Sequence, residues 1–175
     1  MFKIVAIVIV VLIAAFLIYA ATMPSSFRVE RSAVINAPPE KLFAFISDFR
    51  TWEQWSPYEK LDPQMAKTLR GSASGQGAIY EWKGNSNAGS GRIEITEATS
   101  PNKVVMTLDM FEPMEGHNLV EFTLQPKSDA TEVTWTMNGP SPYISKLMIA
   151  AGLMDKMVGG QFEEGLAQLK LVAEK

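Results

Sequence analysis

The hydrophobic pattern divides the chain into one uninterrupted apolar segment and a longer region in which apolar and polar residues alternate. Residues 4–21, IVAIVIVVLIAAFLIYAA, carry no charge. As a helix extended through Met23, this segment reaches about 30 Å at ~1.5 Å per residue, which matches one bilayer core. No polar face breaks the run, so a buried helix of a soluble core is not expected. The pattern predicts a transmembrane anchor over residues 1–23 that contacts the membrane through residues 4–23.

A cleavable signal peptide is the alternative interpretation of this segment. Its apolar region spans about 7–15 residues and ends in an A-x-A-like site, whereas this run is longer and continues into IYAATMP. We therefore expect a single-pass N-terminal anchor that stays uncleaved. Lys3 lies before the segment, while Arg28 and Arg31 lie after it, so the basic residues do not fix the orientation. The extreme N-terminal position favours an exported domain, and the side of the membrane stays open.

After a short linker at residues 24–26, the alternation predicts a first strand in FRVERSAVI. NAPPEKLFAFISD then changes to helical spacing, with Asn36 as the expected N-cap. Asp48 is the expected cap of a second short helix, which Pro57 ends. Turn sequences such as GSASGQG and GNSNAGSG separate the strand patterns that follow. These patterns cover residues 66–70, 78–83, 91–98, 103–111, 117–125 and 131–138.

The C-terminal region has the apolar spacing of a long helix, from about residue 145 to residue 173. The order of elements predicts an α+β fold in which a seven-stranded antiparallel sheet buries one face against this helix. A single helix does not fully cover a strongly curved sheet, so we expect a cavity between them unless large side chains fill it. The apolar stripe of the helix consists of Met154, Val158, Phe162, Leu166, Leu169 and Val172.

The inward faces of the predicted strands are rich in methionine and aromatic residues and almost free of ionisable groups. A packed core explains this pattern without a ligand, because each buried large side chain contributes about 2–3 kcal/mol. A ligand cavity is the alternative, since methionine adapts to irregular apolar ligands and aromatic O–H and N–H groups orient a polar end. The candidate lining residues are Phe45, Phe49, Trp52, Trp55, Tyr80, Trp82, Ile93, Ile95, Met106, Leu108, Met110, Val120, Phe122, Trp135, Met137, Val158 and Phe162.

Charge and composition exclude several functions. The chain has a net charge of −3, and removing Lys3 with the anchor leaves −4, without a basic stripe. We therefore expect no nucleic-acid binding. The absence of cysteine excludes disulfides and thiolate ligands. With His117 as the one histidine and no carboxylates at ligand spacing, neither a metal site nor a bound cofactor is expected, and no serine has the motif of a catalytic triad.

Four segments resemble one known superfamily and occur in its order. They are RSAVINAPPEKLFAFISDFRTWEQWSPY, GQGAIYEWKGNSNAGSGRIEI, TEVTWTMNG and FEEGLAQLK. On these segments residues 27–175 resemble the START-like (SRPBCC) superfamily, in particular the polyketide cyclase/dehydrase-type proteins. The resemblance implies a helix-grip fold, in which a curved antiparallel sheet wraps around a long C-terminal helix and encloses a deep hydrophobic cavity. It also implies that the two short helices close one end of the sheet, with Trp52 and Trp55 as a gate or a simple structural plug.

The leading hypothesis is a membrane-anchored START-like module that binds a hydrophobic small molecule, either lipid-like or polyketide- or quinone-like. The superfamily also contains cyclases and hydrolases, so an enzyme acting in the same cavity is an alternative. It would use Tyr80, Asp109 or His117 with bound water. The alternation turns Asp109 and Glu121 outward, which argues against catalysis. A third alternative is an interaction module with a filled core and no ligand.

Overall fold

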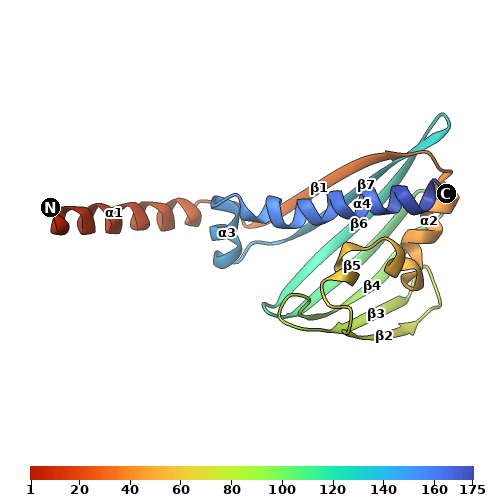
Figure 1. Cartoon of the computed structure of the whole chain (residues 1–175), viewed down its shortest axis with the longest axis horizontal. Helices are drawn as coiled ribbons and strands as arrows, with labels where there is room; N and C mark the ends of the chain where they lie inside the picture. Colours follow the sequence, from red (N-terminus) through yellow and green to blue (C-terminus); the bar gives the residue numbers. More distant parts are fainter.

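The computed structural model describes residues 1–175 and confirms an α+β architecture with an apolar helix extending from one end (Figure 1). One antiparallel sheet has the strand order β1-β7-β6-β5-β4-β3-β2. Strands β2 to β7 therefore lie side by side in chain order. Strand β1 lies beside β7 and forms one edge of the sheet, and β2 forms the other. The strands are β1 (Ser26–Ile35), β2 (Ala66–Gly71), β3 (Ala78–Lys83), β4 (Ser90–Thr99), β5 (Lys103–Glu112), β6 (Gly116–Lys127) and β7 (Ala130–Pro140).

The alternating sequences place one face of the sheet in the core. In β7, Val133 and Trp135 are buried, and Phe122 of β6 pairs with Trp135 across the sheet. Because successive residues of a strand point to opposite faces, Thr134 of β7 and Glu121 of β6 lie on the other side. The helix α4 (Gly160–Ala173) covers the buried face with Phe162 and Leu166. All six predicted strand patterns after the first lie inside observed strands.

The region between β1 and β2 forms three short helices, α2 (Pro39–Ser47), η1 (Phe49–Gln54) and η2 (Pro57–Lys60), of which the last two are 3-10 helices. The expected N-cap at Asn36 is wrong, because Pro38 holds that position and the fixed φ of Pro39 suits the first helical residue. The Asn36 N–H instead donates to Glu174 Oε1 at 2.7 Å. Pro57 also differs from its expected role, since it begins η2 as well as following η1.

The helical tail is interrupted, contrary to the continuous helix expected over residues 145–173. It consists of α3 (Tyr143–Ala150), a turn at residues 151–152, and a second helical stretch that starts at residue 153 and continues through the π-helical turn η3 (Asp155–Gly159) into α4. Gly152 adopts φ +69° in the turn, a conformation that other residues rarely take. The spacing of apolar residues continues through this break, which explains why periodicity alone predicts one helix.

The N-terminal helix α1 (Phe2–Ala21) points away from the sheet, and α3 packs against its last turns (Figure 1). It is the one helix of the chain that is long and apolar enough to cross a membrane, a property that an N-terminal signal sequence shares. The expected linker at residues 24–26 is shorter in the structure, because β1 already begins at Ser26.

A candidate ligand cavity under the sheet

A cavity of about 270 Å³ lies between the concave face of the sheet, η1, η2 and the start of α4. Fifteen of its eighteen lining residues are hydrophobic, so its wall favours an apolar occupant. Asn87 lines the cavity and is exposed to solvent, which places the mouth beside the β3–β4 turn. The wall consists of Trp52, Tyr58, Glu59, Leu61, Met65, Tyr80, Trp82, Asn87, Ala88, Ile93, Leu108, Met110, Asn118, Val120, Trp135, Met137, Val158 and Phe162.

The cavity occupies only the half of the concave face nearest the β3–β4 and β5–β6 turns. In β5, Leu108 and Met110 line the cavity, whereas Met106, two residues before Leu108, is absent from its wall and fully buried. The same division separates Ile93 from Ile95 in β4 and Val120 from Phe122 in β6. Helix α2 packs against β5 and β6 and fills the other half of the face.

This division separates the candidate residues into two groups. The wall contains Trp52, Tyr80, Trp82, Ile93, Leu108, Met110, Val120, Trp135, Met137, Val158 and Phe162. The other candidates, Phe45, Phe49, Trp55, Ile95, Met106 and Phe122, are absent from the wall and pack in or against the hydrophobic core. Trp55 shows why these residues do not line the cavity. Its ring packs edge-on against the rings of Phe122 and Trp135, with centroid distances of 6.1 and 5.8 Å. These large side chains fill the space under the far half of the sheet.

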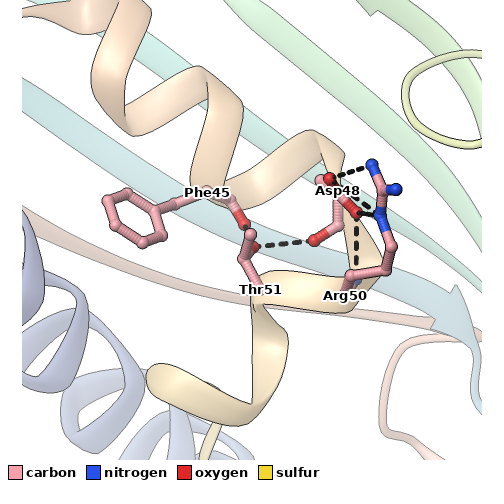
Figure 2. A network of polar contacts seen from close by, with 4 residues as sticks. All are labelled: Phe45, Asp48, Arg50 and Thr51. Carbon is pink, nitrogen blue, oxygen red and sulfur yellow. Dashed lines mark hydrogen bonds and ion pairs between the residues drawn. The ribbon is translucent and has the colours of Figure 1, made fainter.

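A compact polar network shapes the turn that carries Trp52 (Figure 2). The Asp48 carboxylate accepts the Arg50 N–H at 3.0 Å and pairs with the Arg50 guanidinium, which lowers the pKa of Asp48. Thr51 Oγ1 lies 2.7 Å from the carbonyl oxygens of both Phe45 and Asp48 and donates to them. This network ends α2 and starts η1 within two residues. It places Trp52 on the cavity wall, where its indole N–H donates to the Ile46 carbonyl.

One buried carboxylate lies on the mostly apolar wall. Glu59 is 9% exposed, and its Oε1 accepts the Tyr80 hydroxyl at 2.7 Å. Its second oxygen pairs with Lys67 Nζ, which also donates to Glu53 Oε1 at 2.8 Å. Burial, and then the neighbouring Glu59, raise the pKa of Tyr80, so its hydroxyl stays protonated. Desolvation lowers the pKa of Lys67, but the bonds to Glu53 and Glu59 outweigh it and raise that pKa overall.

Two other polar groups of the wall lack such partners. The buried Trp135 indole N–H makes no hydrogen bond. Burial alone raises the pKa of Tyr58, with no contribution from a hydrogen bond to its hydroxyl. The two rings lie near each other, with centroids 6.3 Å apart. Trp135 is held by stacking on Phe162 at 4.1 Å and 10°, which leaves its ring little freedom to turn toward another acceptor.

The residues considered for catalysis lie in different places. Tyr80 lines the cavity, whereas Asp109 alternates with Leu108 and Met110 and therefore faces the opposite side of the sheet. His117 is exposed there, and its Nδ1 lies 2.7 Å from Asp109 Oδ1. Asp109 also lies 3.8 Å from the Arg92 guanidinium. Neither Asp109 nor His117 reaches the cavity.

Several wall residues were not predicted from the sequence. Asn118 precedes Val120 by two positions, so the alternation of β6 contains the signal that places it on the same face. Tyr58 and Glu59 lie on η2, a single turn without periodicity, so no pattern identifies them. The remaining unpredicted residues are in or next to loops, where sequence patterns do not assign a direction: Leu61, Met65, Asn87 and Ala88.

Comparisons with known proteins agree with this architecture. The model of the family described as polyketide cyclase / dehydrase and lipid transport matches residues 26–174. Among solved structures, protein CV1439 from Chromobacterium violaceum is 18% identical with a TM-score of 0.60, over 87% of this chain and 99% of that one. Protein MLL2253 from Mesorhizobium loti is 21% identical with a TM-score of 0.58, over 82% and 96%.

DynU16, described as a protein in the dynemicin biosynthetic locus, is 18% identical with a TM-score of 0.55. That match covers 85% of this chain and 47% of DynU16. No curated protein matches the chain. At these identities the solved structures establish the fold, and the chemistry of the cavity has to be argued from its own residues.

Proposed function

Because the chain belongs to the polyketide cyclase/dehydrase and lipid transport family, we propose that it binds an uncharged hydrophobic small molecule in this cavity while α1 anchors it in a membrane. The apolar cavity under the half of the sheet nearest the β3–β4 and β5–β6 turns carries the proposal. Trp52 and Trp55 would then have different roles, since Trp52 contacts the ligand and Trp55 supports the wall from behind.

The volume of the cavity limits the size of the ligand. An apolar cavity of about 150 Å³ holds benzene, and pockets for drug-sized ligands begin at about 300 Å³. A cavity of about 270 Å³ therefore suits a molecule of one or two fused rings or a short acyl chain. A diacyl lipid would have to leave most of its length outside.

The polar groups of the wall suit a ligand that carries an oxygen acceptor. The half-buried Tyr58 hydroxyl has no hydrogen-bond partner in the protein. The Trp135 N–H has none either, and leaving such a fully buried donor unpaired costs about 1–3 kcal/mol. A carbonyl or hydroxyl oxygen of the ligand would accept the hydrogen bond that the Tyr58 hydroxyl can donate. A polyketide- or quinone-like molecule has this chemistry.

An adjacent pair of β6 residues allows a sharp test. Val120 lines the cavity, and the preceding Leu119 is exposed on the opposite face. The probe is menadione, an uncharged two-ring quinone, added to the full chain in nanodiscs, with quenching of tryptophan fluorescence as the readout. We expect saturable quenching in the wild type and in Leu119→Phe, and its loss in Val120→Phe, whose added ring occupies the cavity.

Both variants should unfold at nearly the wild-type temperature, because the ring added at position 120 would enter existing space and the ring added at position 119 would lie in solvent. Unsaturable quenching in the wild type, equal to that of empty nanodiscs, would contradict the proposal. So would unchanged binding in Val120→Phe. Native mass spectrometry of the protein purified from its own cells would then identify the natural ligand.

Catalysis on the same ligand is the second candidate, and one observation favours it. Glu59 and Tyr80 form an ionisable pair directly on the cavity wall. Both oxygens of Glu59 already bind Tyr80 and Lys67, however, which is the arrangement of a structural pair. Recovery of the bound ligand unchanged after incubation would favour binding, and its chemical conversion, lost in Glu59→Gln, would favour an enzyme.

A further inference from the structure

Helix α3 is an apolar helix that the rest of the chain covers only in part. Its sequence, YISKLMIA, has Lys146 as its one charged residue, and none of its eight residues is buried. Ile144 is 56% exposed, and the helical segment after the turn exposes Leu153 and Met157, the latter by 58%. A helix of this length is marginal in water, so its stability depends on what surrounds it.

The position of α3 identifies these surroundings. The Tyr143 hydroxyl donates to the Leu17 carbonyl oxygen at 3.0 Å, and Ala20 is fully buried although most of α1 is exposed. Both contacts lie in the last turns of α1, and Figure 1 shows α3 beside that end of the helix. When α1 crosses a bilayer, its last turns lie in the interfacial region, where tyrosine is enriched. Helix α3 shares that depth.

We propose that α3 and the segment that follows it as far as the first half of η3, residues 143–157, form a second membrane-contact surface that lies in the interface of the bilayer spanned by α1. This inference rests on the proposed anchoring by α1. The occupant of the surface is lipid, because α3 is continuous with the lipid-facing end of α1. Interfacial helices bury their apolar side about 5–10 Å into the boundary between headgroups and acyl chains.

This contact surface also positions the cavity. Val158 lines the cavity and directly follows Met157 at the end of the surface. The bilayer therefore holds one side of the cavity wall close to the phase in which hydrophobic ligands dissolve. Apolar insertion dominates this contact, since residues 143–157 carry only two lysines and one aspartate, far fewer basic residues than an electrostatic membrane site has.

The absence of native cysteine makes a labelling experiment direct. Single-cysteine variants Ile144→Cys and Met157→Cys of the full chain carry the fluorophore NBD in phosphatidylcholine vesicles with doxyl-labelled lipid as quencher. The matched control is Leu171→Cys, since Leu171 is 60% exposed on the last turn of α4, far from α1. Ile7→Cys, in the second turn of α1, reports insertion of the anchor, and Ile7 is 64% exposed.

We expect strong lipid quenching and blue-shifted emission at positions 7, 144 and 157, and neither at position 171. Quenching at position 7 with positions 144 and 157 behaving like position 171 would overturn this inference and leave the anchor intact. A second outcome would also overturn it: emission at positions 144 and 157 that shifts to the blue as protein density increases but is not quenched by the labelled lipid. That result would show that a second copy of the chain covers α3. Absence of quenching at position 7 would refute the anchoring and the inference together.

Discussion

Two tyrosines of the cavity wall differ in what surrounds their hydroxyls. Tyr80 donates to Glu59, a buried carboxylate, at 2.7 Å. Tyr58 has no such partner, and burial alone raises its pKa. Both hydroxyls remain protonated near neutral pH, but Tyr80 satisfies a group of the protein whereas Tyr58 is free to satisfy a ligand. We therefore expect the Tyr80 hydroxyl to contribute to the stability of the fold and the Tyr58 hydroxyl to contribute to ligand binding.

Removing each hydroxyl in turn tests this separation. We expect Tyr80→Phe to lower the free energy of unfolding by about 1.5–3 kcal/mol, because a buried carboxylate loses a hydrogen bond. Tyr58→Phe should change it by less than about 0.5 kcal/mol and should weaken binding of menadione. Denaturation of the full chain in detergent, followed by tryptophan fluorescence, measures both. Equal losses of stability in the two variants would show that Tyr58 also has a partner within the protein.

The sequence predicts residues of the wall well where a strand carries them. Alternation assigns Leu108, Val120 and Trp135 to one face because the side chains of a strand repeat every two residues. It does not say which half of that face stays open, because this depends on where α2 packs. For this reason Met106 and Phe122 have the same pattern as wall residues but lie in solid core.

At the scale of elements, the π-helical turn η3 is held to β1 by one arginine. Arg31 pairs with Asp155 at 2.8 Å and with Glu163 at 2.6 Å. Bonds from Arg31 lower the pKa of Asp155, so the pair persists until the pH falls through that lowered value. Gly159 permits this approach, since a Cβ on it would lie 2.2 Å from Arg31 Nη2. The glycine thus serves close packing of η3 on the sheet.

The neighbouring glycine provides a matched control, because a Cβ on Gly160 would meet nothing within 4 Å. We expect Gly159→Ala to displace the Arg31 guanidinium and to speed amide hydrogen exchange over residues 151–159. Gly160→Ala should leave this exchange unchanged and stabilise the chain by up to about 1 kcal/mol through helix propensity. Hydrogen exchange with mass spectrometry measures both variants. Equal exchange in the two variants would mean that Arg31 does not hold η3.

The elements themselves were predictable to different degrees. All strands follow from alternation and turn sequences, because both signals are local. The break after α3 does not follow from local signals, because the apolar spacing continues through it. Gly152 and the contact of Tyr143 with α1 redirect the chain there. The turn η2 was missed because proline both ends one helix and begins the next. Tertiary contacts decide each of these cases.

At the scale of the whole molecule, apolar surface is concentrated at one end while charge is spread over the domain. Most of the exposed large apolar residues lie along α1, and the row continues at Tyr143 and Ile144 of α3, whereas the part after residue 23 has a net charge of −4. Electrostatic attachment to membranes would need a positive patch, and salt would screen it within about 10 Å at 0.1 M. Retention on a membrane therefore depends on burying α1 and should be insensitive to both salt and lipid charge.

Vesicle flotation of the full chain tests this dependence. We expect equal retention on neutral and anionic vesicles, at low and high salt. The double substitution Ile9→Arg and Ile13→Arg should release the protein, because each arginine costs about 2.5–3.5 kcal/mol at the centre of a spanning helix. The control, Ile9→Leu with Ile13→Leu, keeps the same positions apolar and should stay bound. Release of the wild type by salt, or retention only on anionic vesicles, would show that charges of the domain rather than α1 hold it at the membrane.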